Sequence, residues 1–101
     1  MSESAEAKRI GATLQPNSGR GTHKKGDMTL GPFLIDVKEY AKSFGVSQSG
    51  WAKLAEDAWM AGRKIPVFRL VLGSGNNKTR LWVIDDELFA DFKEWYEQVN
   101  S

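Results

Sequence analysis

Several residue types and patterns are scarce in this sequence, and each scarcity excludes a class of protein. None of the 101 residues is a cysteine, which excludes disulfides and thiolate metal sites. His23 is the single histidine, so a nucleophile activated by histidine has little support. There is no apolar run long enough to cross a bilayer and no signal-like start, and we therefore expect a cytoplasmic protein without a membrane partner.

An excess of charge of one sign is also lacking, because the net charge is only +1, but the charges are unevenly distributed. Residues 1–26 carry five Lys or Arg against two Glu, which leaves +3, whereas the remainder sums to −2. Four Trp, five Phe and two Tyr can fill one hydrophobic core. We expect a single domain over residues 1–101, in which 1–26 form a helix and a flexible basic Gly-rich loop and 27–101 form the core.

Two short strands with a turn between them are predicted at the start of that core. Residues 33–35 are an apolar run typical of a buried strand, and Gly31-Pro32 before it is a strong turn signal. Side chains alternate faces along a strand, so Asp36 and Lys38 share one face. A hairpin would bring Asp27, at the start of the first strand, beside Asp36. Two carboxylates at one edge of a sheet suit Mg²⁺.

The rest of the chain alternates strands and helices. In chain order we predict a helix over 2–13, strands over 27–30 and 33–38, a helix over 50–61 capped by Ser47 or Ser49 and ended by Gly62, strands over 65–72 and 80–84, and a last helix capped by Asp85. The order α-β-β-α-β-β-α fits an α/β fold with a mixed central sheet flanked by helices. Residues 33–38 and 66–71 of these strands, joined by helix 50–61, are expected to form a right-handed parallel crossover in the middle of the sheet.

Two sets of aromatic residues have different expected roles. Trp51 and Trp59 are predicted to lie in the core, on the apolar face of their helix with Leu54. The last helix carries a wide apolar stripe made of Leu88, Phe89, Phe92, Trp95, Tyr96 and Val99. This stripe is open to two interpretations, burial in the core or contact with a second copy of the chain.

The order of motifs resembles the PD-(D/E)xK nuclease superfamily, and within it the small Holliday junction resolvases of phages and archaea. The motifs are Glu6, Gln15-Pro16-Asn17-Ser18-Gly19-Arg20, Lys25-Gly26-Asp27 and Asp36-Val37-Lys38. The resemblance covers most of the chain and implies a restriction-endonuclease-like sheet. There are two departures: the acid of the last motif is Asp where the resolvases often have Glu, and the first helix offers Glu3 as well as Glu6.

The resemblance implies the site residues. Glu6, Asp27 and Asp36, with the Val37 carbonyl, would hold one or two Mg²⁺, for which Mn²⁺ is the expected substitute. Lys38 would be the catalytic lysine that orients the attacking water or stabilises charge in the transition state. Phosphate contacts are expected from the basic segment and from the second helix, at Lys8, Arg9, Asn17, Ser18, Arg20, His23, Lys24, Lys25 and Lys53.

Together these features predict a Mg-dependent, structure-specific DNA endonuclease, namely a Holliday junction resolvase that nicks four-way junctions in pairs. Paired cuts need two active sites, so we expect a homodimer, with branched DNA as partner and no small-molecule cofactor. The small size is compatible with a phage-encoded protein in a host cytoplasm. Two alternatives stay open. The chain could be another branch, flap or nicking endonuclease of the same fold, or a non-catalytic nucleic-acid-binding protein.

Overall fold

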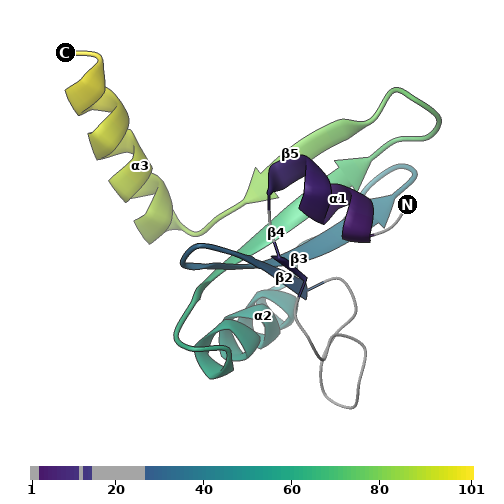
Figure 1. Cartoon of the computed structure of the whole chain (residues 1–101), viewed down its shortest axis with the longest axis horizontal. Coiled ribbons are helices and arrows are strands. Elements are labelled where there is room, and N and C mark those ends of the chain that lie inside the picture. The colour runs from purple at the N-terminus through teal and green to yellow at the C-terminus, as the bar shows by residue number, and fades with distance from the viewer. Residues whose placement is uncertain (1–2, 12, 15–26) are drawn as a thin grey trace.

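The computed structural model describes residues 3–11, 13–14 and 27–101. In chain order the elements are α1 (Glu3–Ile10), β1 (Thr13–Leu14), β2 (Asp27–Leu30), β3 (Phe33–Tyr40), α2 (Gln48–Met60), β4 (Ile65–Leu72), β5 (Thr79–Val83) and α3 (Asp86–Val99). The strands form one sheet in the order β1-β2-β3-β4-β5 (Figure 1). Among these described strands, only β3 and β4 pair in parallel, with α2 between them along the chain. The predicted α/β fold with a mixed sheet is confirmed.

A helix covers each face of the sheet, because the strand side chains alternate between two separate cores. On one face, Ala7 of α1 packs with Met28, Ile35, Val37, Val67 and Val71, and we call this the α1 face. On the other, Leu54 and Ala58 of α2 pack with Leu34, Phe68 and Leu70, and we call this the α2 face. The parity of a residue in its strand therefore tells which helix it faces.

The first predicted helix is wrong at its C-terminal end. It was expected to run to residue 13, but α1 ends at Ile10. Gly11 follows with φ of 76°, a left-handed conformation that glycine adopts at low cost and that commonly ends a helix. Thr13 and Leu14 then pair with Thr29 and Met28 as strand β1, which is too short for any periodicity to predict.

One of the two tryptophans predicted to be in the core is not there. Trp51 packs beside the α2-face core, as expected. Trp59 is 60% exposed. The buried side of α2 runs through Leu54 and Ala58, and each further residue turns the helix by about 100°, so Trp59 points away from the sheet. Its ring lies 4.7 Å from the guanidinium carbon of Arg63.

Helix α3 projects away from the sheet, and the two form the arms of a V (Figure 1). Leu88 at its base is buried, but the rest of its apolar stripe is exposed, so the isolated chain does not absorb the stripe into its core. Over the described ranges 3–11, 13–14 and 27–101, no helix combines the length and apolar character needed to cross a membrane.

Candidate functional site

Two carboxylates face each other across the β2–β3 hairpin, as the sequence predicted. Asp27 and Asp36 are direct partners in the antiparallel register, which places both side chains on the same face of the sheet. Both are buried, with 5% and 1% of the residue exposed. Two like charges are thus held next to each other with little access to water, an arrangement that opposes folding unless a positive charge offsets it.

Lys38 supplies a positive charge at this place. It lies two residues after Asp36 on β3, so it shares the same face, and its Nζ is 3.5 Å from Asp36 Oδ2. The lysine side chain is 27% exposed, so it lies between the buried carboxylates and the surface. Nζ also lies 6.0 Å from the centre of the Phe44 ring, which borders the α2-face core.

These three side chains lie on the α2 face of the sheet. Asp36 and Lys38 alternate with Ile35 and Val37, whose side chains belong to the core of the α1 face. The Val37 side chain is buried in that core, and the contact of its backbone carbonyl with a metal stays a prediction.

Glu6, the fourth residue of the predicted site, lies on the opposite side of the sheet. It is buried on α1 and accepts a hydrogen bond from Arg69 Nε at 3.2 Å. Arg69 is the register partner of Val37 and therefore faces α1. Arg80 Nε donates to Glu6 at 3.4 Å, and Arg9 Nε lies 3.7 Å from the same carboxylate. The sheet separates Glu6 from the Asp27–Asp36 pair, and the structure does not bring the four predicted residues together.

A compact cluster of three metal ligands is correspondingly absent from the residues that the structure describes, where no group of three or more His, Cys, Asp or Glu side chains is arranged to hold an ion. The other acidic candidate, Glu3, begins α1. Val37 could add its carbonyl to the two aspartates. The arrangement therefore offers two carboxylates and one backbone oxygen.

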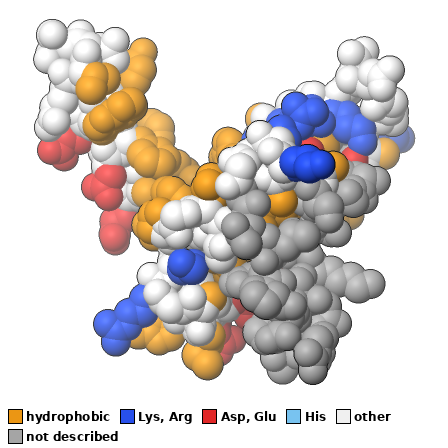
Figure 2. Space-filling model, in the orientation of Figure 1, with side chains coloured by type: hydrophobic (Ala, Val, Ile, Leu, Met, Phe, Trp, Pro, Cys, Tyr) orange, Lys and Arg blue, Asp and Glu red, His pale blue; other side chains and the backbone are white. Residues whose placement is uncertain are grey.

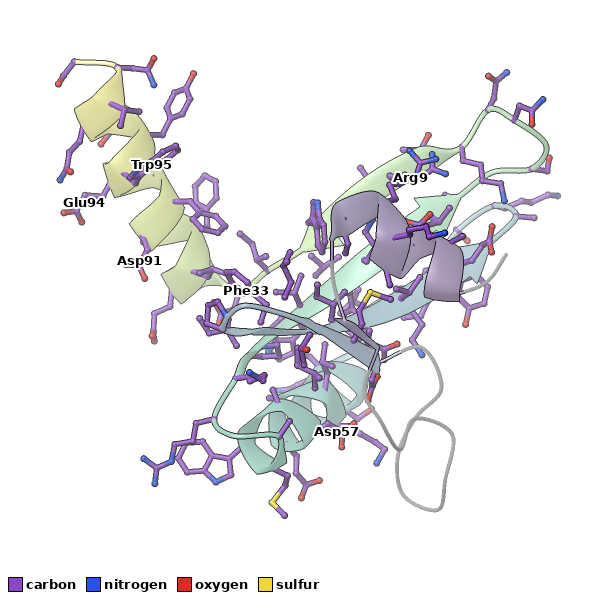
Figure 3. The ribbon with its side chains drawn as sticks, in the orientation of Figure 1. Arg9, Phe33, Asp57, Asp91, Glu94 and Trp95 are labelled. Atoms are coloured by element: carbon purple, nitrogen blue, oxygen red, sulfur yellow. The ribbon has the colours of Figure 1, made fainter. Side chains whose placement is uncertain are left out.

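A further carboxylate on the α2 face was not singled out in the sequence. Asp57 lies on α2 between the buried Leu54 and Ala58, and its Oδ2 is buried without a hydrogen-bond partner within the described part of the chain (Figure 3). The sequence pattern does not distinguish Asp57 from an exposed acid on a helix surface. The burial of its Oδ2 atom depends on how α2 packs against the sheet. Lys53, a predicted phosphate contact, is exposed on the same helix.

A group of cations surrounds Glu6 on the α1 face, and Figure 2 shows Lys and Arg side chains gathered on this side of the molecule. They line an open hollow of about 540 Å³ together with Glu6, Glu39, Ala5 and Val71; its cations are Lys8, Arg9, Lys78 and Arg80. Lys78 is ion-paired with Glu39, and Arg69 below the hollow stacks on Trp82, 4.5 Å from the ring centre. The sequence analysis selected Lys8 and Arg9. Arg80 and Lys78 were not predicted, because the pairing of β5 with β4 places Arg80 on this face and Lys78 immediately precedes β5.

The other predicted phosphate contacts, Asn17, Ser18, Arg20, His23, Lys24 and Lys25, lie outside the described residues. Comparisons with protein-family models, with curated proteins and with solved structures each gave no match.

Proposed function

We propose that this protein is a Mg-dependent DNA endonuclease whose site is formed by Asp27, Asp36 and Lys38. One observation carries the proposal: the β2–β3 register sets two buried carboxylates face to face, with an ammonium group 3.5 Å from one of them. A pair of buried like charges is costly to keep. A divalent cation bound by both carboxylates would offset that cost.

The donor set fits Mg²⁺. This ion prefers oxygen ligands and is commonly held by one or two carboxylates plus substrate phosphate, keeping several waters. Asp27, Asp36 and the Val37 carbonyl would hold it, while Glu6, tied to its arginines, would not. When bound, Mg²⁺ supplies an activated water and neutralises phosphate charge.

The remaining chemistry falls to Lys38. Its ammonium group donates hydrogen bonds and accepts none, so it orients the attacking water by its lone pair or stabilises the charge that develops on the phosphate. Burial on the α2 face limits competing water around these groups, which strengthens each electrostatic contact.

For the substrate, we propose branched DNA, cut in pairs by a homodimer in the manner of the Holliday junction resolvases. Support comes from the order of parts along the chain. The hairpin that carries the two acids is followed by a parallel crossover from β3 through α2 to β4, which is the restriction-endonuclease-like order that the motif resemblance implies.

The test is cleavage of a labelled four-way junction, beside linear duplex and flap controls, with Mg²⁺ or EDTA. We expect paired nicks on the junction from the wild type. Asp36→Asn should bind without cutting, and Glu94→Gln, an exposed acid on α3, should cut normally. Equal cutting of duplex and flap would remove the junction assignment, and no cutting with Mg²⁺ or Mn²⁺ would remove the nuclease.

A second candidate function is binding of nucleic acid without cleavage, and the cation group around Glu6 favours it. The two candidates use opposite faces of the sheet. Phosphate contacts at the hollow would make Lys8→Gln weaken DNA binding while Lys53→Gln leaves it unchanged. Binding at the Asp27–Asp36 site predicts the reverse, because α2 covers that face.

A further inference from the structure

An exposed apolar surface runs along α3, which holds five of the eleven exposed large hydrophobic residues in the described part of the chain. We define the α3 stripe as Phe89, Phe92, Trp95, Tyr96 and Val99, of which each is at least 45% exposed. In Figure 3, Trp95 points toward the inside of the V, whereas Asp91 and Glu94 point away from it. Surfaces of this kind on soluble proteins mark an interaction site.

A second apolar surface lies across the V from the stripe. Leu30, Phe33, Trp82 and Ile84, at the end of the α1 face that α1 does not cover, form what we call the sheet wall. With Leu88, Phe89 and Phe92 they line a hollow of about 450 Å³ at the base of the V, and Trp82 is itself 44% exposed. Figure 2 shows apolar side chains on both arms.

We propose that a second copy of this chain covers both surfaces. Its α3 would lie antiparallel to the first α3, around a two-fold axis near Phe92, and each helix end would reach the sheet wall of the other copy. The chain carries both halves of this contact, the projecting stripe and the wall that receives it. A two-fold interface needs this self-complementarity.

The apolar residues of α3 lie on one side of the helix, at a spacing that suits pairing with another helix. Leu88, Phe92, Trp95 and Val99 follow one another at intervals of four, three and four residues, which is the alternation of a coiled-coil seam. Phe89 and Tyr96 flank this seam on one side.

The exposed area matches what a stable dimer uses. Large aromatic side chains bury about 150–250 Å² each, so the exposed parts of the α3 stripe and Trp82 amount to roughly 600–700 Å² per copy. A standard protein interface buries about 800 Å² per partner.

The charge of α3 disfavours a membrane or a nucleic acid as the partner of the α3 stripe. The polar side of α3 holds five acids, Asp86, Glu87, Asp91, Glu94 and Glu97, against Lys93 alone. An anionic membrane or a nucleic acid would be repelled by such a helix. Residues 15–26 of the chain contain no large apolar side chain with which to fill the V.

This inference identifies the contact of the dimer that the proposed function calls for, but it rests on α3 and not on the aspartates. Association and cleavage can therefore fail separately, and each has its own measurement.

The experiment is the molar mass in solution, by light scattering after size exclusion and by sedimentation equilibrium, at about 1–100 µM chain. The wild type is expected at twice the 11.3 kDa mass of the chain. Trp95→Glu and Tyr96→Glu each place a charge in the seam or beside it, and should weaken association at least about 30-fold. Gln98→Glu adds the same charge on the side of Asp91 and should leave the dimer intact. Circular dichroism should show all variants folded, because these side chains are exposed.

Because the chain has no cysteine, Phe92→Cys gives a single thiol near the proposed axis. Oxidation is expected to cross-link it to its copy, whereas Gln98→Cys should stay uncross-linked. A wild type that remains monomeric at 100 µM overturns the proposal, as does a dimer that both charge variants leave unchanged.

Discussion

Glu6, Asp27 and Asp36 are all buried acids, but their surroundings differ. Glu6 lies among three arginines and accepts a hydrogen bond from Arg69, the arrangement of a structural ion cluster. The aspartates lie opposite each other on adjacent strands with Lys38 beside them. Only the second arrangement brings two carboxylates together, and it is the one suited to a divalent ion.

Mg²⁺ should therefore stabilise the fold through the aspartates. At tenfold excess over its dissociation constant it should add about 1.4 kcal/mol to the free energy of unfolding. Asp27→Asn removes one of the two carboxylates that would hold the ion, so this variant should lose the added stability. Glu94→Gln, on α3, should keep it. Thermal unfolding with increasing Mg²⁺ at constant ionic strength gives the answer, and equal stabilisation of Asp27→Asn would place the ion elsewhere.

Loss of Glu6 should damage the fold itself. Its removal leaves Arg69, whose side chain is 8% exposed, as a buried charge, so Glu6→Ala should cost about 3 kcal/mol. The matched change Glu56→Ala, on the exposed surface of α2, should stay within about 0.5 kcal/mol. Urea unfolding of both variants measures the difference. A Glu6→Ala protein of normal stability would contradict the ion-cluster role.

At the residue scale, strand alternation together with the Gly31-Pro32 turn signal was enough to predict that Asp36, Lys38 and Asp27 share a face. It could not place Glu6, because the side of the sheet on which α1 packs is a matter of tertiary structure. The same holds for Arg80, which reaches Glu6 only through the pairing of β5 with β4.

Among the elements, α2 begins with a side-chain cap, for which the sequence offered two candidates, Ser47 and Ser49. Ser47 Oγ accepts a hydrogen bond from the Gly50 amide at 3.0 Å, so Ser47 is the cap. Ser47→Ala should cost about 1 kcal/mol, and Ser49→Ala, inside the first turn, only a few tenths. Thermal unfolding of the pair checks this, and equal effects would argue against the cap.

Strongly periodic elements were well predicted and weakly periodic ones were not. The bounds of β2 and β4 agree with prediction, and β3 and α2 differ by about two residues at an end. The first helix was misjudged because Gly11 marks its end more clearly than its few apolar residues mark its length. For α3 the helix was predicted correctly, but an apolar stripe looks the same whether a core or a partner covers it.

For the molecule as a whole, charge is divided between regions: acids on the outer side of α3 and cations around the hollow on the α1 face. If Lys8, Arg9, Lys78 and Arg80 each contact a phosphate, affinity for DNA should fall about 100-fold between 50 and 200 mM salt. Lys8→Gln should reduce the slope of log affinity against log salt by about 0.9. Fluorescence anisotropy titrations measure both, and a slope near zero would exclude phosphate binding at this hollow.

The sheet is unevenly supported from one side to the other. Eight register pairs join β3 to β4, whereas β1 adds only two pairs to the outer side of β2. Amide hydrogen exchange should therefore be slowest in β3 and faster in β2. Asp36 stands on the slow strand and Asp27 on the fast one. Local opening of the β2–β3 hairpin would separate the two aspartates while β3 and β4 stay paired. The distance between the two carboxylates can therefore change without global unfolding.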